Sequence, residues 1–203
     1  MRRFKMSRSS AMAALVAAAV LGSPFEGNLL GVGAAPVAAQ SESRQARELD
    51  KLFADLKQAP TQEAADKIVG RIWDIWLRSG RDDTDVMMSR VVANTAGQHY
   101  GLALMLLDEV IEIAPEFAEA WNKRAALRYR MGQFPSAVED IETALKLEPR
   151  HFGALAIKSA ILADMSKWQD ALTAYRAALA INPHLTSRHK VLPELERLAA
   201  QAR

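Results

Sequence analysis

The sequence predicts an all-α fold, a right-handed solenoid of stacked helical hairpins, and three observations support this prediction. Three prolines recur with a 34-residue period, at Pro115, Pro149 and Pro183. The same spacing links three alanines and three aromatic residues, namely Ala103, Ala137 and Ala171, and Tyr100, Phe134 and Trp168. Half of the 203 residues are hydrophobic and only 6% are aromatic, which favours packed helices. A 34-residue period is typical of helix–turn–helix repeats that stack on one another.

Residues 1–39 are predicted to be a signal peptide. Their start is positively charged, with Arg2, Arg3, Lys5 and Arg8. The uncharged apolar run 11–21 has the length of a signal-peptide core and is short for a membrane span. Small residues then lead to Ala39, typical of a cleavage site. We therefore expect export to the periplasm of a Gram-negative-type cell, with cleavage after Ala39 and no stable membrane anchor afterwards.

Two alternatives remain for this segment. It could stay uncut as an N-terminal anchor, and the Arg2-Arg3 start leaves the twin-arginine export route open beside the unfolded-chain route. Residues 1–39 hold four of the 26 basic residues and one of the 24 acidic residues. The remainder therefore has 22 basic and 23 acidic residues, a net charge of −1. No basic patch is left to indicate a nucleic-acid partner.

The chain contains no cysteine. This excludes disulfides, thiolate metal sites, a cysteine nucleophile and a lipoprotein anchor. Stability must therefore come from a packed helical core, for which the part of the chain after Ala39 is long enough.

Residues 40–83 are predicted to form an N-terminal helical hairpin, either a degenerate repeat or a cap. The first helix, 41–59, has an apolar stripe at helical spacing: Leu49, Leu52, Phe53 and Leu56. Pro60 interrupts it, and Thr61 can cap a second helix that ends near Ser79. Trp73 and Trp76 on this second helix are expected to hold the hairpin against the first repeat, with an exposed aromatic docking patch as the alternative.

Three repeats follow, at 84–117, 118–151 and 152–185. The second contains Trp121, Gly132, Phe134, Ala137 and Pro149 in one register. This segment resembles the tetratricopeptide repeat (TPR) family. The first and third repeats keep the second-helix half of the pattern, but Met87 and Leu155 replace the tryptophan, and Gln98 stands where Gly132 does. The resemblance implies a TPR solenoid that binds a protein or peptide.

Residues 186–203 are predicted to be a C-terminal cap helix. After a break at 184–190, a helix near 192–202 places Leu195 and Leu198 on one side and charged residues on the other. Solenoids need terminal caps with a polar outer side.

The family resemblance further implies a binding groove on the concave face, lined by the first helix of each repeat. In register, the groove residues that we expect to bind a partner are Met88, Val92, Asn122, Tyr129 and Arg130. Some TPR proteins clamp a terminal carboxylate with Lys and Asn, and here only Asn122 and Arg130 are available for this. A segment with apolar anchors fits Met88, Val92 and Tyr129 better. Alternatively, the groove is empty or filled by the chain's own termini.

A basic row also recurs at the 34-residue spacing: Arg90, Arg124 and Lys158. TPR proteins usually carry an apolar residue there. In one interpretation the stems pack while the heads reach water or pair with acids such as Asp108 and Asp140. In the other, the row receives acidic groups of a partner.

No catalytic or metal-ligand motif is found in the sequence, so we expect neither enzyme activity nor a cofactor. His99 and His151 fall in predicted turns and are expected to be solvated, and His184 and His189 are poorly spaced for a shared metal. The predicted function is an exported, non-catalytic TPR scaffold. The alternatives are a self-associating structural subunit of a cell-envelope assembly and, more remotely, an enzyme or small-molecule binder that uses the N-terminal hairpin.

Overall fold

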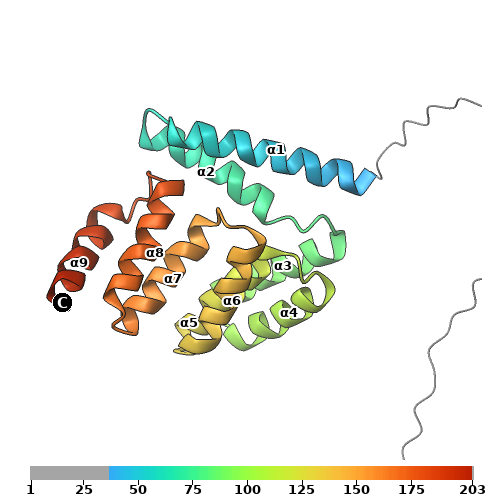
Figure 1. Cartoon of the computed structure of the whole chain (residues 1–203). Coiled ribbons are helices and arrows are strands. Elements are labelled where there is room, and N and C mark those ends of the chain that lie inside the picture. The colour runs from blue at the N-terminus through green and yellow to red at the C-terminus, as the bar shows by residue number, and fades with distance from the viewer. Residues whose placement is uncertain (1–36, 203) are drawn as a thin grey trace, which may run out of the picture. The chain divides into compact units, whose positions relative to one another are not determined.

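A computed structural model describes residues 37–202, which form helices joined by short turns and contain no strand (Figure 1). The helices are α1 (Val37–Lys57), α2 (Gln62–Trp76), α3 (Asp82–Ala96), α4 (Tyr100–Ile113), α5 (Ala118–Arg130), α6 (Phe134–Leu147), α7 (Phe152–Asp164), α8 (Trp168–Ile181) and α9 (Arg188–Gln201). The all-α prediction is confirmed. Residues 1–36 of the predicted signal peptide lie outside the described residues, and the predicted cleavage site after Ala39 falls in the first turn of α1.

The turn inside each repeat contains one residue in the left-handed region at the same place in the 34-residue period. These residues are Gln98 (φ 61°), Gly132 (φ 74°) and Ser166 (φ 59°). Glycine adopts this conformation without a steric cost, whereas Gln and Ser do so with some strain. The turn geometry is therefore set by its place between two packed helices, and glycine is not required there.

The turns between repeats depend on the three in-phase prolines. The residue before each proline, Ala114, Glu148 or Asn182, caps the preceding helix outside the helical region, with φ of −134°, −133° and −121°. A residue before proline is sterically pushed out of the helical region, so each proline ends a helix one residue earlier. The in-phase alanines Ala103, Ala137 and Ala171 are fully buried inside their repeats, where a larger side chain would separate the paired helices.

The N-terminal hairpin of α1 and α2 packs on the third repeat and does not stack on the first. Its core side chains, including Leu56 and Ile72, share one hydrophobic cluster with Phe152 of α7 and Ala178 of α8. Figure 1 shows α1 and α2 lying across the ends of the repeat helices. Among the described residues, the core of the first repeat contains no side chain from α1 or α2. The expectation that Trp73 and Trp76 hold the hairpin to the first repeat is therefore wrong.

The two tryptophans have aromatic partners in the turn that leads into α7. Trp76 stacks on His151 with ring centroids 4.1 Å apart, and Trp73 meets Phe152 edge to face at 5.8 Å. Such pairs add roughly 0.5–1.5 kcal/mol each to the free energy of burial. The hairpin therefore docks on the aromatic residues at the start of α7, although α3 is the helix that follows it directly in the sequence.

Polar contacts fix the same docking at both ends of the hairpin. Arg150 pairs with Asp50 at 2.5 Å, and its guanidinium lies 4.7 Å from the centroid of the Phe53 ring. At the turn between α1 and α2, Gln62 Nε2 donates to the backbone oxygen of His184 at 2.9 Å. Thr61 caps α2 as expected, accepting from the amide of Ala64.

The C-terminal helix α9 begins at Arg188, four residues before the predicted start near 192. Its first turns contain Pro193, which removes one amide donor inside the helix. The early start is held by two contacts: Tyr175 Oη lies 2.8 Å from Ser187 Oγ, and Arg188 Nη1 donates to the oxygen of Pro183 at 2.6 Å. Leu195 is buried against the third repeat as expected, so α9 covers the end of the stack.

The docking of the hairpin can be tested by adding a single methyl group through a glycine-to-alanine substitution. A Cβ at Gly153 would lie 2.8 Å from Trp73, whereas a Cβ at Gly101 would meet nothing within 4 Å. Both glycines are the second residue of a helix. We expect Gly153→Ala to lower the free energy of unfolding by about 1–3 kcal/mol through overpacking. Gly101→Ala is expected to be neutral or to add up to about 1 kcal/mol.

Urea unfolding followed by circular dichroism measures both effects. Equal changes for the two substitutions would show that the Trp73 ring does not rest on Gly153.

Candidate functional site

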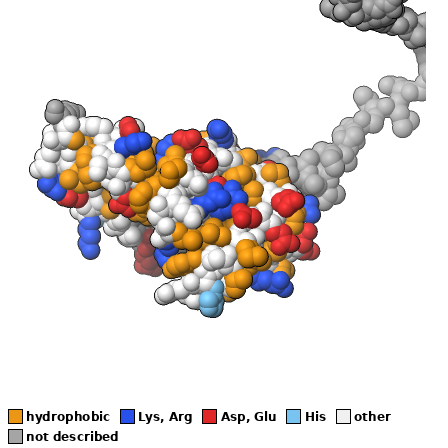
Figure 2. Space-filling model, turned by 90° about the horizontal axis from the view of Figure 1, so that it is seen from below, with side chains coloured by type: hydrophobic (Ala, Val, Ile, Leu, Met, Phe, Trp, Pro, Cys, Tyr) orange, Lys and Arg blue, Asp and Glu red, His pale blue; other side chains and the backbone are white. Residues whose placement is uncertain are grey.

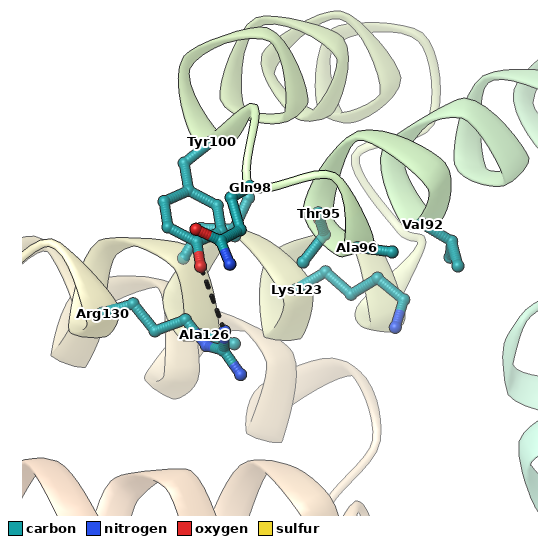
Figure 3. Close-up of a pocket in the computed structure, with 9 residues that line it drawn as sticks. Val92, Thr95, Ala96, Gln98, Tyr100, Lys123, Ala126 and Arg130 are labelled. Carbon is teal, nitrogen blue, oxygen red and sulfur yellow. Dashed lines mark hydrogen bonds between the residues drawn. The ribbon is translucent and has the colours of Figure 1, made fainter.

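A groove between the first and second repeats is the best candidate for a binding site. Its cavity has a volume of about 460 Å³. It is lined by Val92, Thr95, Ala96, Gln98, Tyr100, Lys123, Ala126, Leu127 and Arg130. The lining comes from α3, α5 and the turn that leads from α3 into α4 (Figure 3). We call it the α3–α5 groove.

The α3–α5 groove combines a small apolar floor with two cations. Figure 3 shows Lys123 and Arg130 of α5 on opposite sides of Ala126. Arg130 is exposed and donates to Tyr100 Oη at 3.3 Å, so its guanidinium keeps other donors for a ligand. Val92 exposes 48% of its surface and offers apolar contact. The groove can therefore accept an apolar side chain beside an acidic or carbonyl group.

Of the five residues predicted to bind a partner, Val92 and Arg130 line this groove. Tyr129 is half-buried and links two repeats, since its hydroxyl donates to Asp164 Oδ2 at 2.7 Å. Burial, together with the nearby Asp164 carboxylate, raises the pKa of Tyr129 to about 12. A partner role for Val92, Tyr129 and Arg130 stays a prediction.

The expected surface positions of the other two residues are wrong. Met88 is 2% exposed and lies in the core of the first repeat. Asn122 is 4% exposed, and its Nδ2 donates to Glu119 Oε2 at 2.9 Å. The family register places this position in the groove, but here the position is closed off as part of the core. Asn122 is therefore not available to clamp a terminal carboxylate.

The other end of the predicted concave face carries a buried polar cluster, the Glu119 cluster. Glu119 is 1% exposed and His151 is fully buried. His151 Nε2 lies 2.9 Å from Glu119 Oε2, and Lys123 Nζ lies 2.9 Å from Glu119 Oε1. Together with Asn122, three side chains thus surround one carboxylate. The cluster joins the start of α5 to the start of α7.

His151 is not solvated, which corrects the expectation for a turn histidine. Its Nδ1 accepts from the amide of Ala154 at 3.1 Å and caps α7, which leaves Nε2 as the donor to Glu119. Trp76 stacks on the ring with an interplanar angle of 11°. His99, in contrast, is exposed as predicted. Sequence reasoning missed the Glu119 cluster because its two main members lie far apart along the chain, at opposite ends of the second repeat.

Burial and pairing act on Glu119 in opposite directions. Desolvation alone would raise the pKa of Glu119, but the hydrogen bond from His151 and the charge of Lys123 outweigh it and lower the pKa below its usual range. Glu119 is therefore ionised at neutral pH. Glu119 and His151 are 1% and 0% exposed and Trp76 stacks on the histidine, so we interpret the pair as structural. Within residues 37–202, no group of three or more His, Asp or Glu side chains is arranged to hold a metal ion.

Two members of the basic row pair with acids inside the protein. Arg124 is 12% exposed and contacts Asp140 and Asp108, each at 2.7 Å, and Lys158 lies 3.6 Å from Glu142. Burial alone would lower the pKa of Arg124, but its bonds to the two aspartates raise it. The acid-pairing interpretation thus describes Arg124 and Lys158. Arg90 is exposed and has no ion pair with any described residue.

Comparison with known proteins agrees with this architecture. A family model for the tetratricopeptide repeat matches residues 118–151. A TPR repeat-containing protein of Rhizobium etli is 35% identical over 160 residues, which cover 78% of each chain. The Hsp70-Hsp90 organizing protein of Triticum aestivum is 28% identical over 87 residues, 43% of this chain and 15% of that protein.

Solved TPR domains share the fold at lower identity. The TPR2B domain of yeast Sti1, in complex with pHsp70, has a TM-score of 0.53 at 22% identity, and the match covers 59% of this chain and 98% of that domain. The first TPR domain of Spaghetti (RPAP3), bound to the HSP90 peptide SRMEEVD, has a TM-score of 0.56 at 18% identity, over 58% of this chain and 93% of its own. The Sgt2 TPR domain of Aspergillus fumigatus has a TM-score of 0.57 at 24% identity, over 60% and 82%.

The Glu119 cluster makes stability depend on pH. The folded-state pKa of Glu119 lies below its ordinary value of 4.5. Its contribution is therefore fully present above the unfolded-state pKa and is lost as pH falls through the folded-state pKa. We expect Glu119→Gln to cost about 1–3 kcal/mol at neutral pH and to flatten the acid limb of the stability profile. Urea unfolding at a series of pH values measures this, with the exposed Glu112→Gln as control. An unchanged acid limb in Glu119→Gln would contradict the assignment.

Two in-phase arginines give a matched pair for the basic row. Removing Arg124 leaves Asp140, which is 2% exposed, with Arg128 as its remaining cation. We expect Arg124→Ala to lower the free energy of unfolding by about 3 kcal/mol. Arg90→Ala should change it by less than about 0.5 kcal/mol, because that side chain is on the surface. Thermal and urea unfolding compare the two, and similar losses would rule out the buried ion-pair network as the cause.

Proposed function

Because the chain belongs to the tetratricopeptide repeat family, we propose that it is a non-catalytic scaffold that binds a protein or peptide partner in the α3–α5 groove. The observation that supports this most directly is the groove itself, a 460 Å³ cavity whose apolar floor lies beside the exposed Arg130. It lies between first helices of two repeats, where the family resemblance implies a concave binding face. The partner-binding surface in this proposal consists of Val92, Ala126 and Arg130, with Lys123 at one end.

The chemistry of the groove favours a segment with an apolar anchor and an acidic group. Val92 and Ala126 can contact the anchor, while the free donors of Arg130 can bind a carboxylate in a bidentate manner. Asn122 is held by Glu119, so a clamp for a terminal carboxylate lacks its amide. Two structural neighbours are a pHsp70 complex and a domain with a bound HSP90 peptide. They support a peptide as the class of partner, with no identity implied for this chain.

We propose that the scaffold works outside the cytoplasm. The support is the N-terminal sequence, in which four basic residues, an apolar run and small residues before Gln40 follow one another. Within the described residues, no helix is long and apolar enough to cross a membrane. The absence of cysteine is compatible with an oxidising compartment.

Substitutions in the groove test the binding proposal. A photoreactive amino acid at Ala126, in the full chain expressed in its own type of cell, is expected to cross-link to a discrete partner in the envelope fraction. We expect Val92→Glu and Arg130→Ala each to weaken binding of that partner by about tenfold, equivalent to ~1.4 kcal/mol. Affinity is measured with the purified partner, and circular dichroism checks that each variant is folded.

Met131→Glu is the matched control, because Met131 is also exposed but lies outside the groove. Partner binding that Met131→Glu weakens and the groove variants leave unchanged would contradict the proposed site. Mass spectrometry of the recovered protein reads its N-terminus in the same experiment. A start at Gln40 agrees with cleavage after Ala39, and an intact Met1 would contradict cleavage and favour the uncut anchor.

A further inference from the structure

The first repeat has a face that is built like a repeat–repeat contact, but no described part of the chain is stacked on it. Val86 of α3 corresponds, in the second and third repeats, to Ala120 and Ala154, which are fully buried. Ala120 packs in the core of the preceding repeat, and Ala154 does the same with α6. Val86 itself is 54% exposed. The position that receives the preceding repeat elsewhere is therefore open in α3.

A second position on α3 follows the same rule. Ala93 is exposed, whereas its in-phase counterparts Leu127 and Ile161 are 2% and 0% exposed. Leu127 belongs to the core of the first repeat and Ile161 to the core of the second. The face is open because the N-terminal hairpin docks on the third repeat instead of stacking on α3.

Arg90 shows which charge is missing from this face. Its counterpart Arg124 receives Asp108 from α4, and Lys158 receives Glu142 from α6. In both cases the acid comes from the second helix of the preceding repeat. No repeat precedes Arg90, and among the described residues it has no such acid. An element that covers α3 should therefore bring a carboxylate.

The neighbouring helix α4 adds apolar surface that the stack does not use. Leu102 and Met105 are 55% and 68% exposed. Their counterparts in the other repeats are polar: Ser136 and Asp170, and Glu139 and Thr173. We define the open face as Val86, Arg90, Ala93, Leu102 and Met105. In the space-filling view, exposed hydrophobic side chains stand among acidic and basic ones (Figure 2).

We propose that the open face is a self-association surface, through which two copies of the chain form a two-fold dimer. Of the seven large hydrophobic side chains that are exposed among the described residues, three belong to the open face, namely Val86, Leu102 and Met105. The other end of the stack is covered by α9, which prevents head-to-tail stacking of copies. The most extensive apolar surface that a second copy can offer is thus the same face, as an isologous contact requires.

The charges of the open face are also self-complementary. Arg90 on α3 lacks an acid, and Glu109 on α4 is exposed and makes no ion pair with another described residue. In a two-fold arrangement, each copy can supply the acid that a preceding repeat would supply. This inference goes beyond partner binding in the α3–α5 groove and does not depend on it.

Sedimentation velocity tests the dimer with the purified full chain, whose N-terminus is read by mass spectrometry. We expect a monomer–dimer equilibrium that shifts with protein concentration. Met105→Glu and Ala93→Glu should each raise the dimer dissociation constant by at least about tenfold. Arg90→Glu should weaken the dimer and reduce its sensitivity to salt. Circular dichroism confirms folding, which Met105→Glu should preserve because the side chain is exposed.

Met131→Glu is again the control, since it adds the same charge at an exposed hydrophobic site on another repeat. The dimer should withstand it. A monomer at every concentration, an open-ended assembly, or a dimer that the open-face variants leave intact would each overturn the proposal. If the groove variants Val92→Glu and Arg130→Ala fail to weaken partner binding while the dimer behaves as expected, only the groove proposal is contradicted.

Discussion

The contact between Glu119 and His151 beneath Trp76 is the interaction on which the arrangement of the chain depends. A buried carboxylate is costly unless it is paired and hydrogen-bonded. Glu119 meets this requirement with His151, Lys123 and Asn122, which come from α5 and the turn before α7. Because Trp76 stacks on the same histidine, the polar cluster and the hairpin are stabilised together. The contact between the second and third repeats and the docking of α1 and α2 therefore depend on the same histidine.

This docking divides the surface of the repeats into distinct regions. Trp73 rests on Gly153, so the hairpin covers the start of α7. The alternative in which the groove is filled by the chain's own termini stays a prediction. The groove between α3 and α5 stays open, and so does the outer side of α3. The docking of the hairpin on the third repeat thus leaves both of these surfaces exposed.

The periodic residues predicted most of the fold, and the aperiodic contacts explain what they missed. Ala137 and Pro149 act within one repeat, so their spacing alone indicates their role. The docking of Trp73 could not be read from a period, because its partner Phe152 lies two repeats further along the chain and belongs to a unit of different length. Met88 failed for another reason. The family register gives the side of the helix, but Met88 and its in-phase counterpart Asn122 are both buried here, and the register does not show how deep that side lies.

The basic row shows how a periodic position acquires different meanings along one stack. Arg124 and Lys158 occupy the same place in their repeats and are neutralised by acids of the repeat before them. Arg124 is paired with Asp140 of its own repeat as well as with Asp108 of the preceding helix, and Lys158 is paired with Glu142 of the preceding helix. The first repeat keeps the cation and lacks the helix, so Arg90 stays in water. In this chain the in-phase apolar residues account for the stacking of the repeats. The in-phase cations differ, because Arg124 and Lys158 are paired with acids and Arg90, at the open end of the stack, is not paired with any described residue.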